Sequence, residues 1–182
     1  MKKSWLIVIM GVIVLLAGCG GNDFKPNAFS KADACIVKSD SHSKKVCYGD
    51  TRTKAEKVLG DGEEFVGEYY EYENGVVIGY RKNKVVAISL REESEGEYST
   101  ARGAEAGMEE KAIKRLYGAK SVNGNTEYGL TYYIDMDKWE PIVTERPSKA
   151  DQDILIISTQ TNDDEETDNI WIGDLAFAIM QM

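Results

Sequence analysis

The side chains with the clearest chemical potential in this 182-residue chain are its three cysteine thiols, Cys19, Cys35 and Cys47. A thiol can be acylated, can be oxidised to a disulfide or can act as a nucleophile. Use as a nucleophile needs a neighbouring base, and the one histidine, His42, lies in the polar segment KSDSHSKK. A histidine among serines and lysines is typical of a solvated segment. The pattern therefore indicates no Cys–His or Ser–His catalytic pair.

Cys19 ends the apolar run that opens the chain. Lys2 and Lys3 come first, and the segment from Trp5 to Leu16 is almost wholly apolar. This run is too short to cross a hydrocarbon core, which takes about 20 helical residues. A positive start, a short apolar run and small residues before the cysteine are typical of an export signal. Residues 1–18 are therefore predicted to be a signal peptide.

The segment Leu16-Ala17-Gly18-Cys19 resembles the lipobox of bacterial lipoproteins. In that family the cysteine thiol receives a diacylglyceryl group, and the chain is cut just before it. The resemblance implies that Cys19 is the lipidated mature N-terminus of a protein that faces outward from the cell membrane. One acyl chain anchors weakly, and two anchor stably. The alternative is a buried structural cysteine that follows an ordinary export signal.

Composition limits the partners of the mature chain. Residues 1–18 carry only the charges of Lys2 and Lys3, so their removal changes the net charge from −9 to −11. This balance argues against binding nucleic acid or anionic lipid through bulk electrostatics. No second apolar run approaches 18 residues, so the sequence predicts no membrane-spanning helix after the signal.

Cys35 and Cys47 remain as an even pair in an exported chain, where disulfides persist. Closure of this short loop would stabilise the fold by about 3 kcal/mol in the chain-entropy model. A Cys35–Cys47 disulfide is therefore expected. The alternative is two separate thiols, one of them buried beside Tyr48.

The segment after the anchor, GGNDFKPNAFSKADA, has few aliphatic residues and no hydrophobic period. Glycine, asparagine, proline and serine favour irregular, flexible chain. Residues 19–43 are therefore predicted to be a flexible tether that holds the folded part away from the membrane.

Two later segments share one pattern. GDTRTKAEKVLG, residues 49–60, and GMEEKAIKRLYG, residues 107–118, each begin and end with glycine. Apolar residues at helical spacing predict a short helix in each. Thr51 is expected to cap the first helix, and Gly60 and Gly118 are expected to end the two helices.

Strand-like runs follow each predicted helix. After Gly60, an Asn74-Gly75 hairpin signal and a turn over residues 81–84 predict three strands. After Gly118, residues 126–136, 153–161 and 169–180 predict three more. The expected fold class is α+β, with two tandem two-layer units, repeat 1 over residues 44–92 and repeat 2 over residues 98–182. Each unit would pack a short helix, or a helix pair, on an antiparallel meander of three to four strands.

The succession of Gly-x-Thr, a short helix, Leu/Tyr-Gly and tyrosine-rich strands resembles the beta-lactamase-inhibitor-like fold. That superfamily includes tandem-domain secreted inhibitors and the small lipoprotein of the outer-membrane barrel-assembly machinery. The Thr100-x-Arg102-Gly103-x-x-x-Gly107 segment also resembles uncharacterised lipoproteins of Gram-positive bacteria. Repeat 1 departs from the family in having room for three strands instead of four. Repeat 2 departs from it in having Met108-Glu109 where a small hydroxyl residue is usual.

The resemblance implies a role in binding, because the inhibitors grip their target proteins with the concave face of the sheet. Carried over by position, the residues expected to contact a partner are Tyr69, Glu71, Tyr132, Tyr133 and Trp171. Tyrosine and tryptophan suit such a surface because they bring large contact area at low entropic cost.

The remaining motifs predict no enzyme, cofactor or metal site. The acidic segment NDDEETDN, residues 162–169, lacks the glycine and the spacing of a known calcium loop and favours a solvated hairpin loop. No phosphate loop, zinc spacing or nucleophile elbow is present. The sequence therefore predicts a non-catalytic, membrane-anchored protein-binding module. The alternative is a structural or accessory component of an envelope assembly or a mobile-element surface function.

Overall fold

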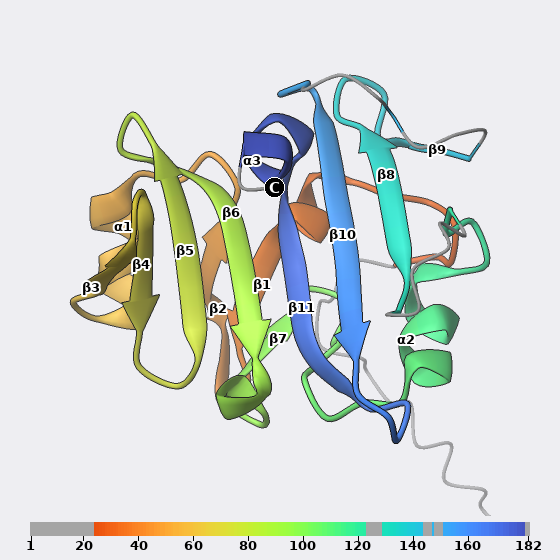
Figure 1. The fold of residues 1–182 in the computed structure, drawn as a ribbon, viewed down its shortest axis with the longest axis horizontal. Helices are drawn as coiled ribbons and strands as arrows, with labels where there is room; N and C mark the ends of the chain where they lie inside the picture. Colours follow the sequence, from red (N-terminus) through yellow and green to blue (C-terminus); the bar gives the residue numbers. More distant parts are fainter. Residues whose placement is uncertain (1–23, 123–128, 144–146, 148–150, 181–182) are drawn as a thin grey trace, which may run out of the picture.

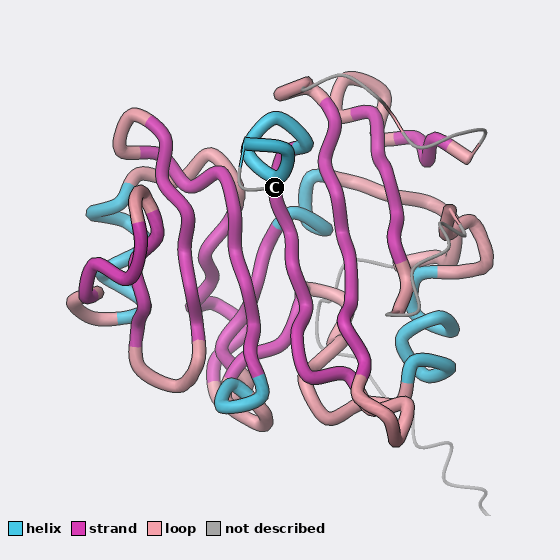
Figure 2. The backbone as a smooth tube through the Cα atoms, in the orientation of Figure 1, coloured by secondary structure: helices cyan, strands magenta, loops and turns pink. Residues whose placement is uncertain are grey.

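The computed structural model describes residues 24–122, 129–143, 147 and 151–180. Most of the regular structure in this part of the chain is β-strand (Figures 1 and 2). In chain order the elements are η1 (Lys31–Ala34), β1 (Cys35–Lys38), β2 (Ser41–Cys47), α1 (Arg52–Leu59), β3 (Glu63–Val66), β4 (Tyr69–Tyr72), β5 (Val76–Arg81), β6 (Lys84–Arg91), η2 (Glu92–Ser94), β7 (Tyr98–Thr100), α2 (Glu110–Tyr117), β8 (Thr131–Asp135), β9 (Glu140–Ile142), β10 (Ile154–Thr161), β11 (Thr167–Asp174) and α3 (Leu175–Met180).

The strands form two antiparallel sheets. The large sheet has eight strands in the order β3-β4-β5-β6-β11-β10-β8-β9, and the small sheet has the order β2-β1-β7. Strands β6 and β11 pair directly, so the strands that follow α1 and those that follow α2 belong to one continuous sheet. The predicted α+β class with antiparallel sheets is confirmed.

The main core lies between the two sheets, which overlap in Figure 1. Ile36 and Val46 from the small sheet and Ile78, Ile88 and Ile157 from the large sheet are at most 1% exposed. Helices α1 and α2 bury residues in this same core, so they cover the inner face of the large sheet together with the small sheet. Helix α3 packs through Phe177 on Val86 and Ala87, in a separate cluster on the outer face.

Turn residues fix the register of the strands after α1. Asn74 and Gly75 have φ values of 57° and 67° and join β4 to β5, as the sequence predicts. Lys82 and Asn83 have φ values of 51° and 62° and join β5 to β6. A fourth strand, β3, precedes the three expected ones, so the prediction that repeat 1 has room for only three strands is wrong.

The two predicted helices begin and end close to the expected residues. The Thr51 side chain accepts a hydrogen bond from the Lys54 amide at the start of α1, whereas Glu109 provides no side-chain cap for α2. Gly60 and Gly118 follow the last helical residues with φ values of 89° and 98°. A side chain at Gly118 would also collide with Asn27, so the N-terminal segment passes too close for any other residue.

The predicted tether over residues 19–43 is wrong from Phe24 onward. Phe29, Ala34 and Ile36 are buried, and strand β1 lies in the middle of the small sheet. The predicted start of repeat 1 at residue 44 falls inside strand β2. The segment is ordered by contacts with Arg102 and by the pairing of β1 with β2 and β7, which its own polar composition does not indicate.

Buried Arg102 holds the N-terminal segment in place. Its Nε donates to Asp33 Oδ1, and both side chains are at most 1% exposed. Its Nη1 donates to the carbonyl oxygens of Lys25 at 3.0 Å and Leu116 at 2.9 Å, and its Nη2 donates to the carbonyl of Ala28. One side chain thus joins the N-terminal segment to the end of α2.

The C-terminal part also differs from its prediction, because the expected strand over residues 169–180 ends at Asp174 and continues as α3. The Asp174 carboxylate accepts the backbone N–H of Phe177 at 2.7 Å, as a residue that caps a helix start does. None of the helices in the described ranges is long and apolar enough to span a bilayer.

Candidate partner-binding surface

Four of the five predicted contact residues lie on the outer face of the large sheet. The register places Tyr69 and Tyr133 at two ends of one cross-strand row that also contains Gly79, Ala87 and Ile156. Glu71 and Trp171 lie in the adjacent row, because side chains two residues apart along a strand share a face.

Tyr132 does not belong to this surface, and its prediction as a contact residue is wrong. It is 1% exposed, and its hydroxyl donates to the Gly118 carbonyl at 2.8 Å on the inner face. Its ring lies 5.9 Å from the ring of Phe29 and 5.5 Å from that of Tyr117. Burial raises the pKa of Tyr132 to about 12. Neighbouring residues on a strand point to opposite faces, and α2 with the N-terminal segment covers this one.

Helix α3 covers the row that contains Tyr133. Tyr133 is 6% exposed and packs in a cluster with Ile156 and Leu175, so it is not an open contact residue. Tyr69 is half-buried, with its ring 5.1 Å from that of Phe177. A side chain at Gly79 would collide with Phe177, so the glycine gives the helix room to approach. The helix that the sequence analysis missed therefore closes this part of the sheet.

Trp171 is half-buried between the two apolar clusters of the outer face. A side chain at Gly173 would collide with its ring. Trp171 thus contributes mainly to packing. Of the predicted contact residues, Glu71 is the one that lies beside open surface.

The open surface lies at the edge of the large sheet, where β3 pairs on one side only with β4. All four residues of β3 are exposed. Phe65 and Val66 are 53% and 58% exposed, the two highest values among the large hydrophobic residues that the structure describes. Glu71 accepts a hydrogen bond from Arg91 Nη1 at 2.9 Å, and the Arg91 guanidinium lies 4.7 Å from the centre of the Phe65 ring.

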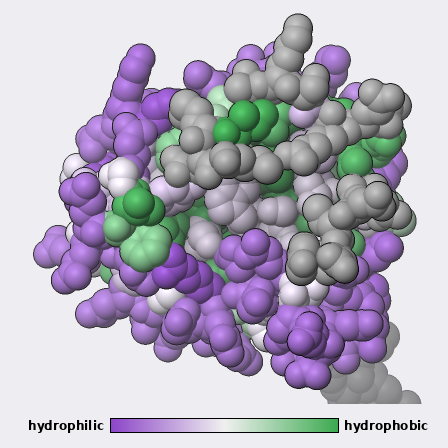
Figure 3. All heavy atoms as spheres, in the orientation of Figure 1, coloured by the Kyte–Doolittle hydropathy of each residue, from purple (hydrophilic) through white to green (hydrophobic). Residues whose placement is uncertain are grey.

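Carboxylates surround this apolar pair. A hollow of about 370 Å³ beside β3 is lined by Asp61, Glu63, Glu64, Phe65, Glu71, Tyr72 and Glu73. Of these five carboxylates, only Glu71 forms an ion pair among the described residues. Figure 3 shows the same contrast, a small hydrophobic patch within hydrophilic surface at the end of the molecule where Figure 1 places β3. We call this surface, β3 with its surrounding carboxylates, the acidic edge.

The sequence contains a local signal for the acidic edge. The run Glu63-Glu64-Phe65-Val66 comes directly before Gly67, whose φ of 57° allows the tight turn into β4. This run forms a four-residue strand between two glycine-containing turns. A strand at the edge of a sheet pairs with a neighbour on one side only. Exposed apolar residues at such an edge are unusual, because natural edges are normally protected against pairing.

The described residues contain no metal-binding arrangement. No group of three or more His, Cys, Asp or Glu side chains there is placed to hold a metal. His42 lies exposed on β2 between Ser41 and Ser43, not in a linker as predicted. Asn162 accepts the backbone N–H groups of Asp164 and Glu166, which makes the acidic loop a compact turn.

A second buried charge pair ties α3 to the rest of the fold. The Asp174 side chain is 0% exposed and accepts hydrogen bonds from Arg81 Nη2 at 2.6 Å and the Tyr48 hydroxyl at 2.9 Å. Burial, and then the negative charge of Asp174, raises the pKa of Tyr48 to about 12. The bonds of Asp174 to Arg81, to Tyr48 and to the Phe177 backbone thus join the start of α3 to β5 and to the segment after β2.

Cys35 and Cys47 form the predicted disulfide. Cys35 and Cys47 face each other in the β1–β2 pair and are joined by a disulfide. Cys19 lies outside the described residues.

Comparison of the chain with models of known protein families, with curated proteins and with solved structures found no match. Arguments about function therefore rest on the residues themselves.

Proposed function

We propose that this protein is a non-catalytic protein-binding module, held at the outer side of a cell membrane by lipid on Cys19. The apolar run, the small residues before Cys19 and the resemblance to a lipobox support the anchor. The disulfide between Cys35 and Cys47 supports exposure to an oxidising compartment, because such bonds persist there.

The proposal includes a tandem origin for the fold, related to the beta-lactamase-inhibitor-like superfamily. Helices α1 and α2 have eight residues each, and each ends before a glycine with positive φ whose N–H donates to the carbonyl four residues back. In the large sheet four strands follow each helix, β3 to β6 and β8 to β11, and β7 belongs to the small sheet. This correspondence supports two units that share one sheet through β6 and β11.

The acidic edge is the observation that carries the binding function. Its unpaired backbone groups can accept an additional strand, and its carboxylates favour a positively charged one. Phe65 and Val66 supply exposed apolar area of the kind that marks interaction sites. We therefore propose that the partner presents an extended basic segment with apolar side chains, which adds to β3 as a further strand.

Site-specific crosslinking in intact cells tests this proposal. A photoreactive phenylalanine analogue at Phe65 should give a crosslinked product with a partner, and the same analogue at exposed Lys57 on α1 should not. Because carboxylates recruit the partner, Glu63→Lys with Glu71→Lys should abolish the product at residue 65. Equal products at both positions, or a product unaffected by the charge reversal, would show that the acidic edge is not the site.

A further inference from the structure

Five exposed cations gather where the described chain begins. Lys25 and Lys31 belong to the N-terminal segment, Lys114 and Arg115 to the last turn of α2, and Lys120 to the loop after α2. None of them forms an ion pair within the described residues. We call these five residues the basic rim. This local cationic surface contrasts with the net charge of the whole chain, which is −9.

Specific contacts bring the two parts of the basic rim together. The Asn27 backbone N–H donates to the Tyr117 carbonyl at 2.8 Å, and Asn27 Oδ1 accepts the Lys120 backbone N–H at 2.9 Å. Arg102 Nη1 links the carbonyls of Lys25 and Leu116. The N-terminal segment is therefore fixed against the C-terminal end of α2, and its lysines cannot move away from those of the helix.

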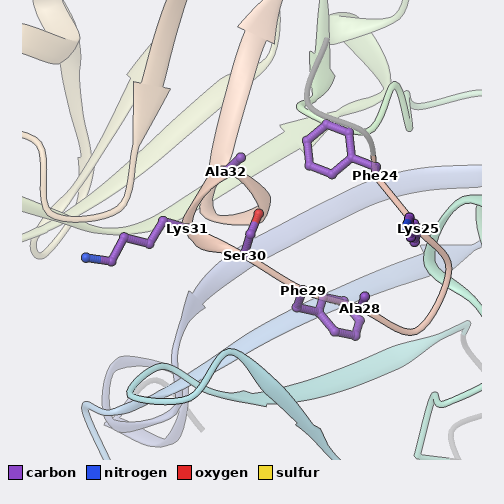
Figure 4. A pocket seen from close by; sticks show the side chains of 7 residues that line it. All are labelled: Phe24, Lys25, Ala28, Phe29, Ser30, Lys31 and Ala32. Atoms are coloured by element: carbon purple, nitrogen blue, oxygen red, sulfur yellow. The ribbon is translucent and has the colours of Figure 1, made fainter.

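No carboxylate of the described residues forms an ion pair with the rim, although Arg115 interacts with Glu109 over a longer distance. Asp33 is buried and already paired with Arg102. Glu109 lies at the opposite end of α2 and pairs with Lys111 at 2.7 Å. Beside the rim, Phe24 and Phe29 line a hollow of about 460 Å³ together with Lys25 and Lys31, and in Figure 4 Lys31 extends away from both rings.

The distance from the anchor is short. Cys19 and Phe24 are five residues apart, so a fully extended chain would separate them by about 18 Å at most. The tether of about 25 residues expected from the sequence is thus reduced to residues 20–23, which carry only the charge of Asp23. A lipid on Cys19 would keep the basic rim within this distance of the bilayer.

We infer that the basic rim rests on the surface of an anionic bilayer and orients the protein on the membrane. This inference rests on the proposed lipid anchor. Lysine and arginine beside an anionic leaflet are attracted to it, and this attraction strengthens an acyl anchor. Phe24 lies half-buried among these cations, at the level where aromatic residues meet lipid headgroups.

The carboxylates of the acidic edge lie too far from the rim to oppose this contact, and those around the Glu109–Glu166 bridge lie at the opposite end of α2 from the rim. Tyr132 on β8 bonds to the Gly118 carbonyl at the end of α2, so the basic rim lies near β8. Strand β3 lies six strand positions from β8, which is about 29 Å at 4.8 Å per strand. That distance exceeds three Debye lengths of about 8 Å at physiological salt, so the acidic edge is screened from the rim. Figure 1 places α2 and β3 at opposite ends of the long axis.

Fluorescence quenching of the lipidated full-length protein in vesicles tests the inference. Phe24→Trp reports contact at the rim, and Phe65→Trp is the matched control at the acidic edge. In vesicles of phosphatidylcholine with phosphatidylglycerol, brominated lipid should quench the fluorescence of Phe24→Trp more than that of Phe65→Trp, because both variants share the emission of Trp139 and Trp171. Equal quenching at both positions, or none at position 24, would overturn the inference.

Charge variants give a second measurement that does not depend on Phe24. Each of Lys25→Gln, Lys31→Gln and Lys120→Gln should shift the equilibrium away from bilayer contact about fivefold, and the triple variant more than 100-fold, by the attraction expected per cation. Lys44→Gln, Lys45→Gln and Lys82→Gln remove the same charge from exposed sites elsewhere and should change little. Indistinguishable triple variants would count against the basic rim.

The mass of the mature N-terminus separates the two hypotheses. If Cys19 carries lipid but Phe24→Trp is quenched no more than Phe65→Trp in anionic vesicles, the anchor stands and the basic rim does not. If the mature chain lacks lipid, the anchor fails and the inference fails with it. Quenching that is equal in pure phosphatidylcholine and in the anionic mixture would also overturn the inference, because no attraction to anionic lipid would then be involved.

Discussion

The two ends of the large sheet differ in whether their charged side chains are buried and paired. Near β8 the guanidinium of Arg102 is buried, paired with Asp33 and bonded to three backbone carbonyls. At β3 five carboxylates stand around two exposed apolar residues, and only one of them has a cationic partner. A buried pair of this kind holds a segment of irregular chain in place, whereas unpaired surface charge leaves binding capacity free. The comparison therefore assigns stability to the Arg102–Asp33 pair, and under the proposed function it assigns partner recognition to the acidic edge.

The largest expected effect comes from breaking the buried pair. Arg102→Met should destabilise the fold by about 3–5 kcal/mol, because it leaves the Asp33 carboxylate buried without a partner. Urea unfolding measures the change. Arg115→Met, an exposed position on α2, is the matched control and should change the free energy of unfolding by less than about 0.5 kcal/mol. Similar values for the two variants would remove the contrast between the ends of the sheet.

The disulfide contributes the next effect, also on the N-terminal side. Replacement of Cys35 and Cys47 together by alanine should cost about 3 kcal/mol, because the unfolded chain loses its crosslink. Peptide mapping of the exported protein without reduction should recover the two cysteines in one linked fragment. Both cysteines recovered as free, alkylatable thiols would contradict the structure.

Tyr132 gives a smaller effect with a characteristic pH dependence. Its pKa is raised by burial to about 12, above the usual value near 10, so the folded state favours the protonated phenol. The stability from this group is complete below pH 10 and is lost as pH rises from 10 to 12. Tyr132→Phe removes one hydrogen bond, costs about 1 kcal/mol at neutral pH and should make the alkaline loss of stability shallower.

Unfolding of Tyr132→Phe and the parent at pH 8 and at pH 11 measures both quantities. An unchanged difference between the two pH values in the variant would show that Tyr132 titrates normally. Tyr48→Phe should give a similar reduction of the alkaline slope, because its pKa is also raised to about 12.

How far the sequence predicts the fold depends on whether a signal is local. Asn74-Gly75, Gly60 and Gly118 act on their immediate neighbours through backbone conformation, and all three lie where predicted. Residues 25–33 contact Arg102, at least 69 positions away, β1 pairs with the distant strand β7, and no local pattern reports such contacts. Local composition alone therefore predicts a tether where the structure has a central strand.

The candidate site shows the same limit on a smaller scale. Strand alternation correctly separates Tyr69 and Glu71 from Tyr70 and Tyr72. It does not say which face α3 covers, and that helix depends on the Asp174 carboxylate, held by Arg81 from a distant strand. The strand pattern therefore predicts Tyr133 on open surface although Tyr133 is buried. It does not predict that Phe65 is exposed.

The smallest expected change in stability is at the acidic edge, where the effect on binding should be large. Phe65→Ser removes exposed apolar area and a contact with Arg91, so the free energy of unfolding should change by less than about 0.5 kcal/mol. Partner crosslinking from a probe at Val66 should nevertheless be lost, since Phe65 supplies the apolar contact that carboxylates cannot. Phe29→Ser, a buried aromatic near Arg102, gives the reverse pattern and destabilises the fold by several kcal/mol. If Phe65→Ser unfolds the protein or leaves crosslinking intact, β3 is not the site of partner recognition. The contrast between a stabilising Arg102–Asp33 pair and a partner-binding acidic edge is then wrong.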